Sequence, residues 1–138
     1  MNIRPFREPD RARVVELWDL CGLLAPGNDP NRDIDMKLAF QPEWLLVGEE
    51  DGQVLATVMA GYEGHRGWIN YLAVDPGCRR KGYGREMMAH AEQALFDFGC
   101  PKINLQVRAG NEDVKAFYEA IGYLLEDRYD FGKRNQCH

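Results

Sequence analysis

Hydrophobic and polar positions recur along this chain with two periods, one typical of helices and one typical of strands. Apolar residues at helical spacing predict four helices, from Asp10 to about Cys21, from Asp29 to about Phe40, from Gly84 to Phe98 and from Asn111 to Ile121. Asp10, Asp29 and Asn111 stand where helix N-caps belong. Alternating or β-branched runs predict strands at residues 2–6, 44–49, 53–62, 68–74 and 102–107, with one or two more within 123–132.

The Asp51-Gly52 pair between two predicted strands is typical of a tight hairpin turn. Because a hairpin joins antiparallel strands, the sheet is predicted to be mixed, which disfavours a Rossmann arrangement. The chain has 138 residues, 45% of them apolar, enough for one domain that buries roughly two thirds of its unfolded surface. We therefore expect a single α/β domain with a mixed α+β sheet over residues 1–138, held without disulfides or a structural metal.

The balance of charges narrows the range of partners. Seventeen basic and twenty-two acidic residues give a net charge of −5, which is unfavourable for a protein that coats nucleic acid or an anionic membrane. No apolar run approaches the ~20 residues that cross a bilayer, and the first ten residues lack the apolar part of a secretory signal, so a cytoplasmic protein is expected. Four scattered cysteines without a C-x-x-C pair are expected to be reduced thiols, and the absence of serine excludes a serine hydrolase.

A basic, glycine-rich segment lies between the strand predicted to end at Val74 and the helix predicted to begin near Gly84. It reads Arg79-Arg80-Lys81-Gly82-Tyr83-Gly84-Arg85 and holds four of the seventeen basic residues. Successive backbone N–H groups at a helix N-terminus bind phosphate anions, and glycines allow close approach. The sequence of this segment differs from the P-loop motif at Tyr83. It differs from the dinucleotide-binding motif at Met87, where that motif requires a third glycine. A solvated basic turn is the alternative interpretation.

Three linked motifs follow one another along the second half of the chain. They read Leu72-Ala73-Val74-Asp75-Pro76, then Arg79-x-x-Gly82-x-Gly84, then Asn111-x-x-Val114-x-x-Phe117-Tyr118-x-x-x-Gly122-Tyr123. These motifs resemble the L-x-V-x-P, R-x-x-G-x-G and N-x-x-A-x-x-F-Y-x-x-x-G-F signatures of the GNAT superfamily of N-acetyltransferases, with mild departures at Val114 and Tyr123. The resemblance covers nearly the whole chain and implies the GNAT fold, a mostly antiparallel mixed sheet flanked by about four helices.

The resemblance implies an enzyme that uses acetyl-CoA and an amine acceptor, without a metal. The main chain of Leu72, Ala73 and Val74 would pair with the pantetheine arm. The pyrophosphate would be held, chiefly through backbone amides, by Arg79, Arg80, Lys81, Gly82, Gly84 and Arg85. Asn111 would bind the pantetheine or adenine side of the cofactor, or would serve only as an N-cap. Tyr118 would protonate the departing thiolate, or would be only an amphipathic side chain at the edge of the core.

The sequence leaves the general base open. Relatives that acetylate protein N-termini carry a glutamate where this chain has Gln106, and an amide cannot accept a proton. Candidates elsewhere are Glu63, His65, Glu49 and its neighbour Glu50, and a water chain to bulk solvent is an equal alternative. A site poor in bases favours an α-amine of pKa ~7.8 over a lysine amine of pKa ~10.4, because less free energy is needed to deprotonate it.

Recognition of the acceptor is predicted for residues 23–40 and 62–68. There Asp29, Asp33 and Asp35 would attract a cationic amine, or would simply stabilise a helix start. The main alternative function is a non-catalytic CoA-binding or regulatory module that has lost its base. A nucleic-acid module is disfavoured by the acidic charge and by the lack of clustered aromatic residues near the basic segment. We expect no nucleic-acid or membrane partner and a monomer or homodimer.

Overall fold

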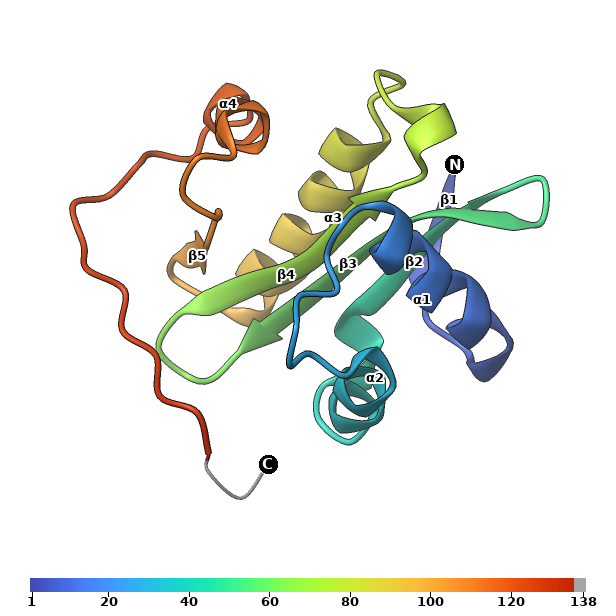
Figure 1. Ribbon diagram of the computed structural model, residues 1–138, viewed down its shortest axis with the longest axis horizontal. Helices are drawn as coiled ribbons and strands as arrows, with labels where there is room; N and C mark the ends of the chain where they lie inside the picture. The colour runs from blue at the N-terminus through green and yellow to red at the C-terminus, as the bar shows by residue number, and fades with distance from the viewer. Residues whose placement is uncertain (136–138) are drawn as a thin grey trace. The chain divides into compact units, whose positions relative to one another are not determined.

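A mixed five-stranded sheet organises the first part of the chain in the computed structural model, which describes residues 1–135 (Figure 1). The strands are β1 Asn2–Pro5, β2 Leu45–Glu50, β3 Gln53–Tyr62, β4 Gly67–Val74 and β5 Ile103–Leu105. The α-helices are α1 Arg11–Leu20, α2 Pro30–Leu38, α3 Tyr83–Phe98 and α4 Glu112–Ala120. Three short 3-10 helices are η1 Glu8–Asp10, η2 Pro42–Trp44 and η3 Pro76–Cys78. Residues 1–106 form one compact unit, and the chain from Val107 onward forms a second.

The sheet has the order β1-β2-β3-β4-β5, and its pairs are antiparallel except for the parallel pair β4-β5. Asp51 and Gly52 have φ of 54° and 77°, so both residues of the β2–β3 turn adopt the left-handed conformation of a type I′ hairpin. This confirms the hairpin expected from the sequence. The mixed sheet and the four α-helices of residues 1–135 confirm the predicted fold class.

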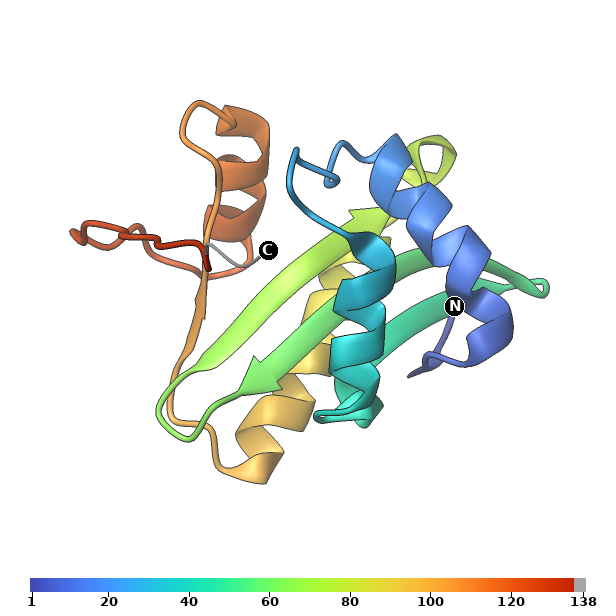
Figure 2. The same ribbon diagram turned by 60° about the horizontal axis from the view of Figure 1, so that its bottom comes forward.

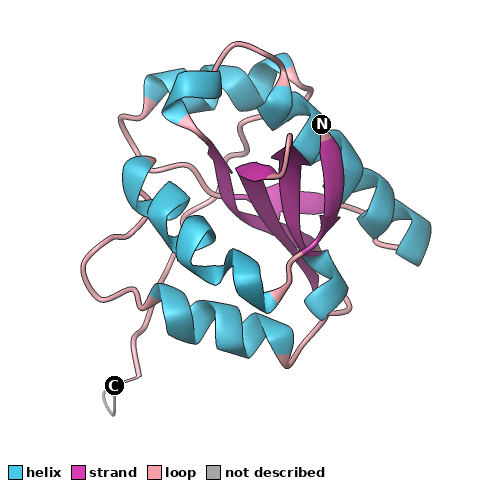
Figure 3. Cartoon of the chain, turned by 90° about the vertical axis from the view of Figure 1, so that its right-hand side faces the viewer, coloured by secondary structure: helices cyan, strands magenta, loops and turns pink. Residues whose placement is uncertain are grey.

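Helices lie on both faces of the sheet (Figures 2 and 3). α1 and α2 cover one face, and their fully buried apolar residues are Val14, Leu17, Trp18 and Ile34. α3 covers the opposite face, and its buried residues are Met87, Met88, Ala91 and Leu95. Burial of one Leu- or Met-sized side chain stabilises a fold by about 1.5–3 kcal/mol, so these two apolar layers hold the three helices against the sheet.

Asp10 is the N-cap residue of α1, as predicted, but its side chain has other partners. α1 does begin after Asp10, but the carboxylate of Asp10 makes no capping bond to it. Instead, the carboxylate accepts a hydrogen bond from the Arg7 amide at 2.8 Å and pairs with the Arg4 guanidinium at 2.8 and 3.0 Å. The cause is η1, which already places Asp10 at φ −80° and ψ −15° and so directs the side chain back along the chain. The hydrogen bond from Arg4 holds the pKa of Asp10 below its usual range.

The strands expected within residues 123–132 are absent, which corrects this prediction. Beyond Gly122, the chain is neither helix nor strand as far as residue 135. Its apolar side chains are exposed, and Leu124, Leu125, Tyr129 and Phe131 keep between 76% and 93% of their accessible surface. Residues that favour β-structure form a strand only where a neighbouring strand supplies backbone hydrogen bonds. No strand of the described chain pairs with this segment.

Lys37 on α2 is a buried cation, with 8% of its surface exposed and its Nζ 5.8 Å from the centre of the Phe40 ring. It forms no ion pair within residues 1–135, and burial lowers its pKa to about 8. The unfolded chain therefore keeps, between pH 8 and about 10.5, a proton that the folded chain has lost. The burial of the charge destabilises the fold below pH 8, and this cost disappears as the pH rises through that interval.

Lys37→Met is accordingly expected to stabilise the protein at pH 7 by about 1–2 kcal/mol, because methionine keeps the apolar stem and removes the buried charge. The measurement is urea unfolding at pH 7 and pH 10. At pH 10 the difference from the unsubstituted protein is expected to be small. Lys133→Met removes an exposed lysine and serves as the control, with no expected change at either pH. A stability gain that is independent of pH would contradict the explanation.

Candidate functional site

The chain that leaves β4 turns before α3 and is tied to α1. The Asp75 carboxylate accepts a hydrogen bond from the Gly77 amide at 2.8 Å and pairs with Arg13 of α1 at 2.5 Å, so the end of β4 is tied to the first helix. The turn then passes through two residues of positive φ, Arg80 at 69° and Gly82 at 82°. Arginine adopts this conformation only at a cost of about 1–2 kcal/mol, which points to a backbone shape that serves a function.

The N-terminus of α3 has no side-chain cap. Its N-cap residue is Gly82, and the first intrahelical bond runs from the Glu86 amide to the Gly82 carbonyl at 3.0 Å. The amides of residues 83–85 precede that bond and belong to the group of N–H donors that a helix leaves unpaired at its start. By contrast, Asp29 caps α2 and Asn111 caps α4 through their side chains. The start of α3 is therefore a set of amide donors suited to an anion.

Four basic side chains surround this helix start, and all four are exposed: Arg79, Arg80, Lys81 and Arg85. Within residues 1–135 none of them forms an ion pair, and Arg79 only approaches the sulfur of Cys21 at 3.6 Å. Tyr83 lies in the same turn and donates its hydroxyl to Glu50 at the tip of the β2–β3 hairpin, which raises the pKa of Tyr83 to about 12. Amide donors and unpaired cations thus converge at residues 79–85, which we call the phosphate loop.

β4 carries a bulge in its middle. Thr57 pairs with Ala73 and Met59 with Asn70, so β4 contributes one residue more than β3 between these two rungs. Tyr71 lies in the bulge with φ of 53°. The buried Thr57 hydroxyl donates to the Tyr71 carbonyl at 2.9 Å and accepts the Trp18 indole N–H at 3.0 Å, which fixes the bulged backbone from within the core. The sequence analysis did not identify this bulge.

Beyond the bulge, one edge of β4 is open. β5 pairs with β4 only at residues 67–69, so no strand of the described chain covers that edge at residues 72–74. The Asp75 amide donates to the Leu55 carbonyl of β3 at 2.8 Å. Since hydrogen-bonded positions alternate along an antiparallel pair, the backbone N–H and C=O of Leu72 and Val74 point away from β3. An extended ligand with amide groups can therefore pair with this edge.

Tyr118 and Asn111 belong to the second compact unit. Burial raises the pKa of Tyr118 to about 12, and its ring makes edge contacts with the rings of Phe117 and Tyr123 at 5.1 and 5.7 Å. The Asn111 side chain accepts the Val114 amide at 3.4 Å, so Asn111 is the N-cap of α4. The predicted roles of these two residues toward a cofactor remain predictions.

The predicted candidates for the general base have structural partners. Glu63 accepts hydrogen bonds from the amides of His65 and Arg66, both at 2.5 Å, and these bonds, with the one from Arg66 the largest cause, hold its pKa below the usual range. Glu49 pairs with Arg4 at 3.0 Å, and Glu50 accepts the Tyr83 hydroxyl. The three carboxylates therefore anchor a loop, a strand and the phosphate loop, and none is identified as a base.

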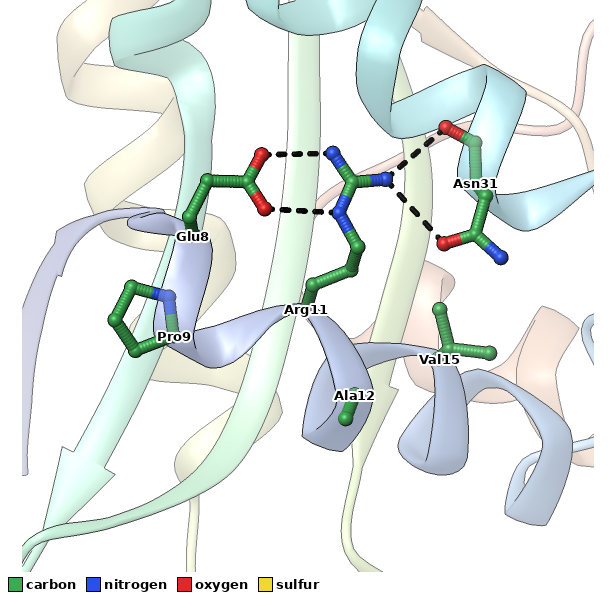
Figure 4. A pocket seen from close by; sticks show the side chains of 6 residues that line it. All are labelled: Glu8, Pro9, Arg11, Ala12, Val15 and Asn31. Carbon is green, nitrogen blue, oxygen red and sulfur yellow. Dashed lines mark hydrogen bonds and ion pairs between the residues drawn. The ribbon is translucent and has the colours of Figure 1, made fainter.

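Two open hollows lie on the face of α1 and α2. The first has a volume of about 440 Å³ and lies between η1, α1 and α2 (Figure 4). Its central side chain is Arg11, which donates to Glu8 at 2.8 and 3.0 Å, to Asn31 at 3.3 Å and to Asp35 at 2.6 Å. Since this guanidinium is already surrounded by acceptors, it ties α1 to α2. No residue predicted to hold a cofactor lines this hollow.

The second hollow adjoins the bulge, and we call it the β4 hollow. It has a volume of about 300 Å³ and is lined by Leu23, Asn28, Asp33, Asn70 and Tyr71. The loop between α1 and α2 that supplies two of these residues passes over β4 (Figure 2). Leu23, Asn28 and Asp33 fall in the segment predicted to recognise the acceptor, whereas Asn70 and Tyr71 were missed. The sequence carries no local signal for these two residues, because the bulge that brings both of them to one hollow is held by Thr57, which is distant along the chain.

Comparison with known proteins identifies the family. Residues 11–123 match the acetyltransferase (GNAT) family, so the chain belongs to this family of acetyltransferases, as its motifs predicted. A protein named acetyltransferase from Yersinia enterocolitica is 42% identical over 134 residues, which cover 97% of this chain and 95% of that protein.

Solved structures support the GNAT fold. An aminoglycoside antibiotic 6'-N-acetyltransferase from Acinetobacter haemolyticus gives a TM-score of 0.73 at 18% identity, covering 98% of this chain and 99% of that one. Naa20 from Chaetomium thermophilum, solved with a bisubstrate analogue, gives a TM-score of 0.71 at 22% identity, covering 88% of this chain and 70% of that one. The predicted fold is therefore confirmed.

The described residues contain neither a membrane-spanning helix nor a cluster of metal ligands. No helix among them has the length and apolar character needed to span a bilayer. No group of three or more His, Cys, Asp or Glu side chains in residues 1–135 is arranged to hold a metal ion.

Proposed function

We propose that this acetyltransferase transfers the acetyl group of acetyl-CoA directly to a primary amine while both substrates are bound. The observation that carries the proposal is the phosphate loop: an uncapped helix N-terminus, begun by Gly82 at positive φ, lies among four basic side chains without ion pairs in the described chain. This is the chemistry that a diphosphate requires. The backbone amides of Lys81, Gly82, Gly84 and Arg85 would hold the pyrophosphate of the cofactor.

The open edge of β4 would hold the pantetheine arm. Leu72 and Val74 direct their backbone groups away from β3, and the arm carries amides that can pair with them in the manner of an added strand. Ala73 between them is buried against α1 and needs no direct contact with the cofactor. The thioester would then lie near the bulge, where a backbone N–H could polarise its carbonyl oxygen.

The transfer forms a C–N bond and breaks the C–S bond through a tetrahedral oxyanion. The attacking amine must be neutral, and after attack its extra proton passes to water, since no side chain of the described residues is identified as a base. The thiolate of CoA leaves and takes a proton. Tyr118 would donate that proton, because a phenol of pKa about 12 is fully protonated at neutral pH.

The names of related structures support this chemistry. The Acinetobacter haemolyticus neighbour is named as an N-acetyltransferase of an aminoglycoside, which is an amine. Another neighbour, AAC(6')-Iy, was solved with a bisubstrate analogue that joins CoA to an acetylated neamine. A non-catalytic CoA-binding module remains the second candidate function, because the structure identifies no general base.

Isothermal titration with acetyl-CoA and with acetylated pantetheine, which lacks the diphosphate, tests the phosphate loop. We expect acetyl-CoA to bind and acetylated pantetheine to bind at least tenfold more weakly, corresponding to about 1.4 kcal/mol. Equal affinities would contradict the proposed cofactor site. A thiol-release assay with primary amines then separates the two functions, because binding without turnover on any amine would favour the non-catalytic module.

A further inference from the structure

The β4 hollow contains a single charged side chain. Among its five lining residues only Asp33 is acidic, and none is basic. The tyrosine and the two asparagines add polar groups without charge. A hollow of about 300 Å³ is at the lower end of the range for small-molecule sites, so it suits a ligand of a few heavy atoms rather than a folded partner.

The Tyr71 side chain holds the carboxylate of Asp33 in place. The Tyr71 hydroxyl donates to one of its oxygens at 2.6 Å. The Tyr71 ring stacks on the fully buried indole of Trp18, with ring centroids 3.7 Å apart and planes 10° from parallel. Its backbone is fixed by the bond from Thr57. These contacts position the tyrosine and with it the Asp33 carboxylate, and a charge that is positioned before a ligand arrives reduces the entropy lost on binding.

The three acids at the start of α2 have different partners. Asp29 accepts the Arg32 amide at 3.1 Å and caps the helix. Asp35 pairs with Arg11 at 2.6 Å on another side of the helix. Asp33 alone lines the hollow, and its described partner is a neutral phenol. The pKa of that phenol is raised mainly by burial and further by the charges of Asp33 and Asp29. The phenol therefore stays a hydrogen-bond donor beside these negative charges.

We propose that Asp33 binds the second cationic group of the acceptor, and that this acceptor is a small aliphatic diamine. The inference rests on the proposed transfer to an amine and names its substrate class. One amine, once neutral, attacks the thioester, while the other remains an ammonium ion beside Asp33. Asn28 and Asn70 provide further polar groups for the same ammonium. Tyr71 acts as a positioning residue, because it touches the carboxylate.

Three acceptors of equal chain length test the proposal: 1,4-diaminobutane, n-butylamine and 4-aminobutyrate. They end in an ammonium, a methyl group and a carboxylate. We expect kcat/KM to fall about tenfold from the diamine to butylamine, and further for 4-aminobutyrate, since a hydrogen bond to a charged group is worth about one power of ten or more. Asp33→Asn keeps an acceptor for the Tyr71 hydroxyl and removes the charge, and it is expected to make the diamine and butylamine equivalent.

Matched variants distinguish binding at the β4 hollow from a general effect of the negative charge on α2. Asp35→Asn removes the same charge from the same helix outside the hollow, and it is expected to leave the preference for the diamine unchanged. Tyr71→Phe keeps the stacked ring but releases Asp33, and it is expected to raise KM for the diamine about threefold at unchanged kcat. Circular dichroism and acetyl-CoA affinity check that each variant is folded.

The outcomes distinguish the two proposals. Transfer to all three amines with equal efficiency, or a diamine preference that survives Asp33→Asn, would overturn the role of Asp33 and leave the proposed function intact. Failure to bind acetyl-CoA or to acetylate any amine would contradict the proposed function. In that case calorimetric titration of the protein with 1,4-diaminobutane decides the site, because binding that is lost in Asp33→Asn supports it and absence of binding overturns it.

Discussion

Gly82→Ala is expected to weaken the binding of acetyl-CoA about 10- to 100-fold, corresponding to about 1.4–2.8 kcal/mol, while the protein remains folded. Gly82 has φ of 82° and ψ of 9°, a conformation that alanine adopts at a cost of about 1 kcal/mol. A Cβ at this position would meet no protein atom within 4 Å. The new methyl group would therefore occupy the open space beside the amides where a phosphate oxygen would approach.

Gly99→Ala is the matched control for this substitution. Gly99 ends the same helix at φ 111°, and a Cβ there would also meet no atom within 4 Å. Both variants are expected to lose a similar amount of stability in urea unfolding, but only Gly82→Ala is expected to lose affinity in titration calorimetry. If both variants bind acetyl-CoA like the unsubstituted protein, α3 does not bind the pyrophosphate through its N-terminus.

Tyr118→Phe is expected to lower kcat about 10- to 100-fold and to leave the dissociation constant of acetyl-CoA nearly unchanged. The loss is limited because a CoA thiol of pKa ~8.5 is a tolerable leaving group even without an acid. Burial raises the pKa of Tyr118 to about 12, so the phenol remains protonated through the working range. In the unsubstituted enzyme kcat is therefore expected to rise with pH as the acceptor amine deprotonates. No decrease in kcat is expected at any pH lower than about 11.

Tyr123→Phe removes a neighbouring phenol whose ring lies 5.7 Å from that of Tyr118, and it serves as the control. Steady-state kinetics with a saturating amine are expected to separate the two variants. A Tyr118→Phe protein with unchanged kcat at every pH would show that Tyr118 is a packing residue only, as its ring contacts with Phe117 and Tyr123 also allow.

The features predicted correctly from the sequence are those with local causes. Asp29 followed by Pro30 predicted the start of α2, and the structure has the Asp29 carboxylate on the Arg32 amide. Asp51-Gly52 predicted the hairpin, because only residues tolerant of positive φ form that turn. The glycines of residues 79–85 likewise predicted a turn that begins α3, and Gly82 has the positive φ that such a turn requires, whereas the binding of a pyrophosphate by this turn stays a prediction.

The predictions that failed depend on distant partners. Asp10 is the N-cap residue of α1 as predicted, but the pairing of its carboxylate with Arg4 was not foreseen. Residues 123–132 have the composition of a strand, but no described strand pairs with them. The bulge at Tyr71 was missed because Thr57, the only buried threonine hydroxyl beneath it, is fourteen residues away along the chain. No local pattern encodes such a contact.

The sequence by itself determined the order of helices and strands as far as α4, the family motifs and the basic, glycine-rich turn, since these follow from backbone preferences and charges within short segments. Only the tertiary structure decided that β5 leaves the edge of β4 open after Ile69 and that Tyr71 holds Asp33 at a small polar hollow. These features arise where strands diverge and where side chains from α1, α2 and β4 meet. Their positions depend on packing between residues that are far apart in the chain.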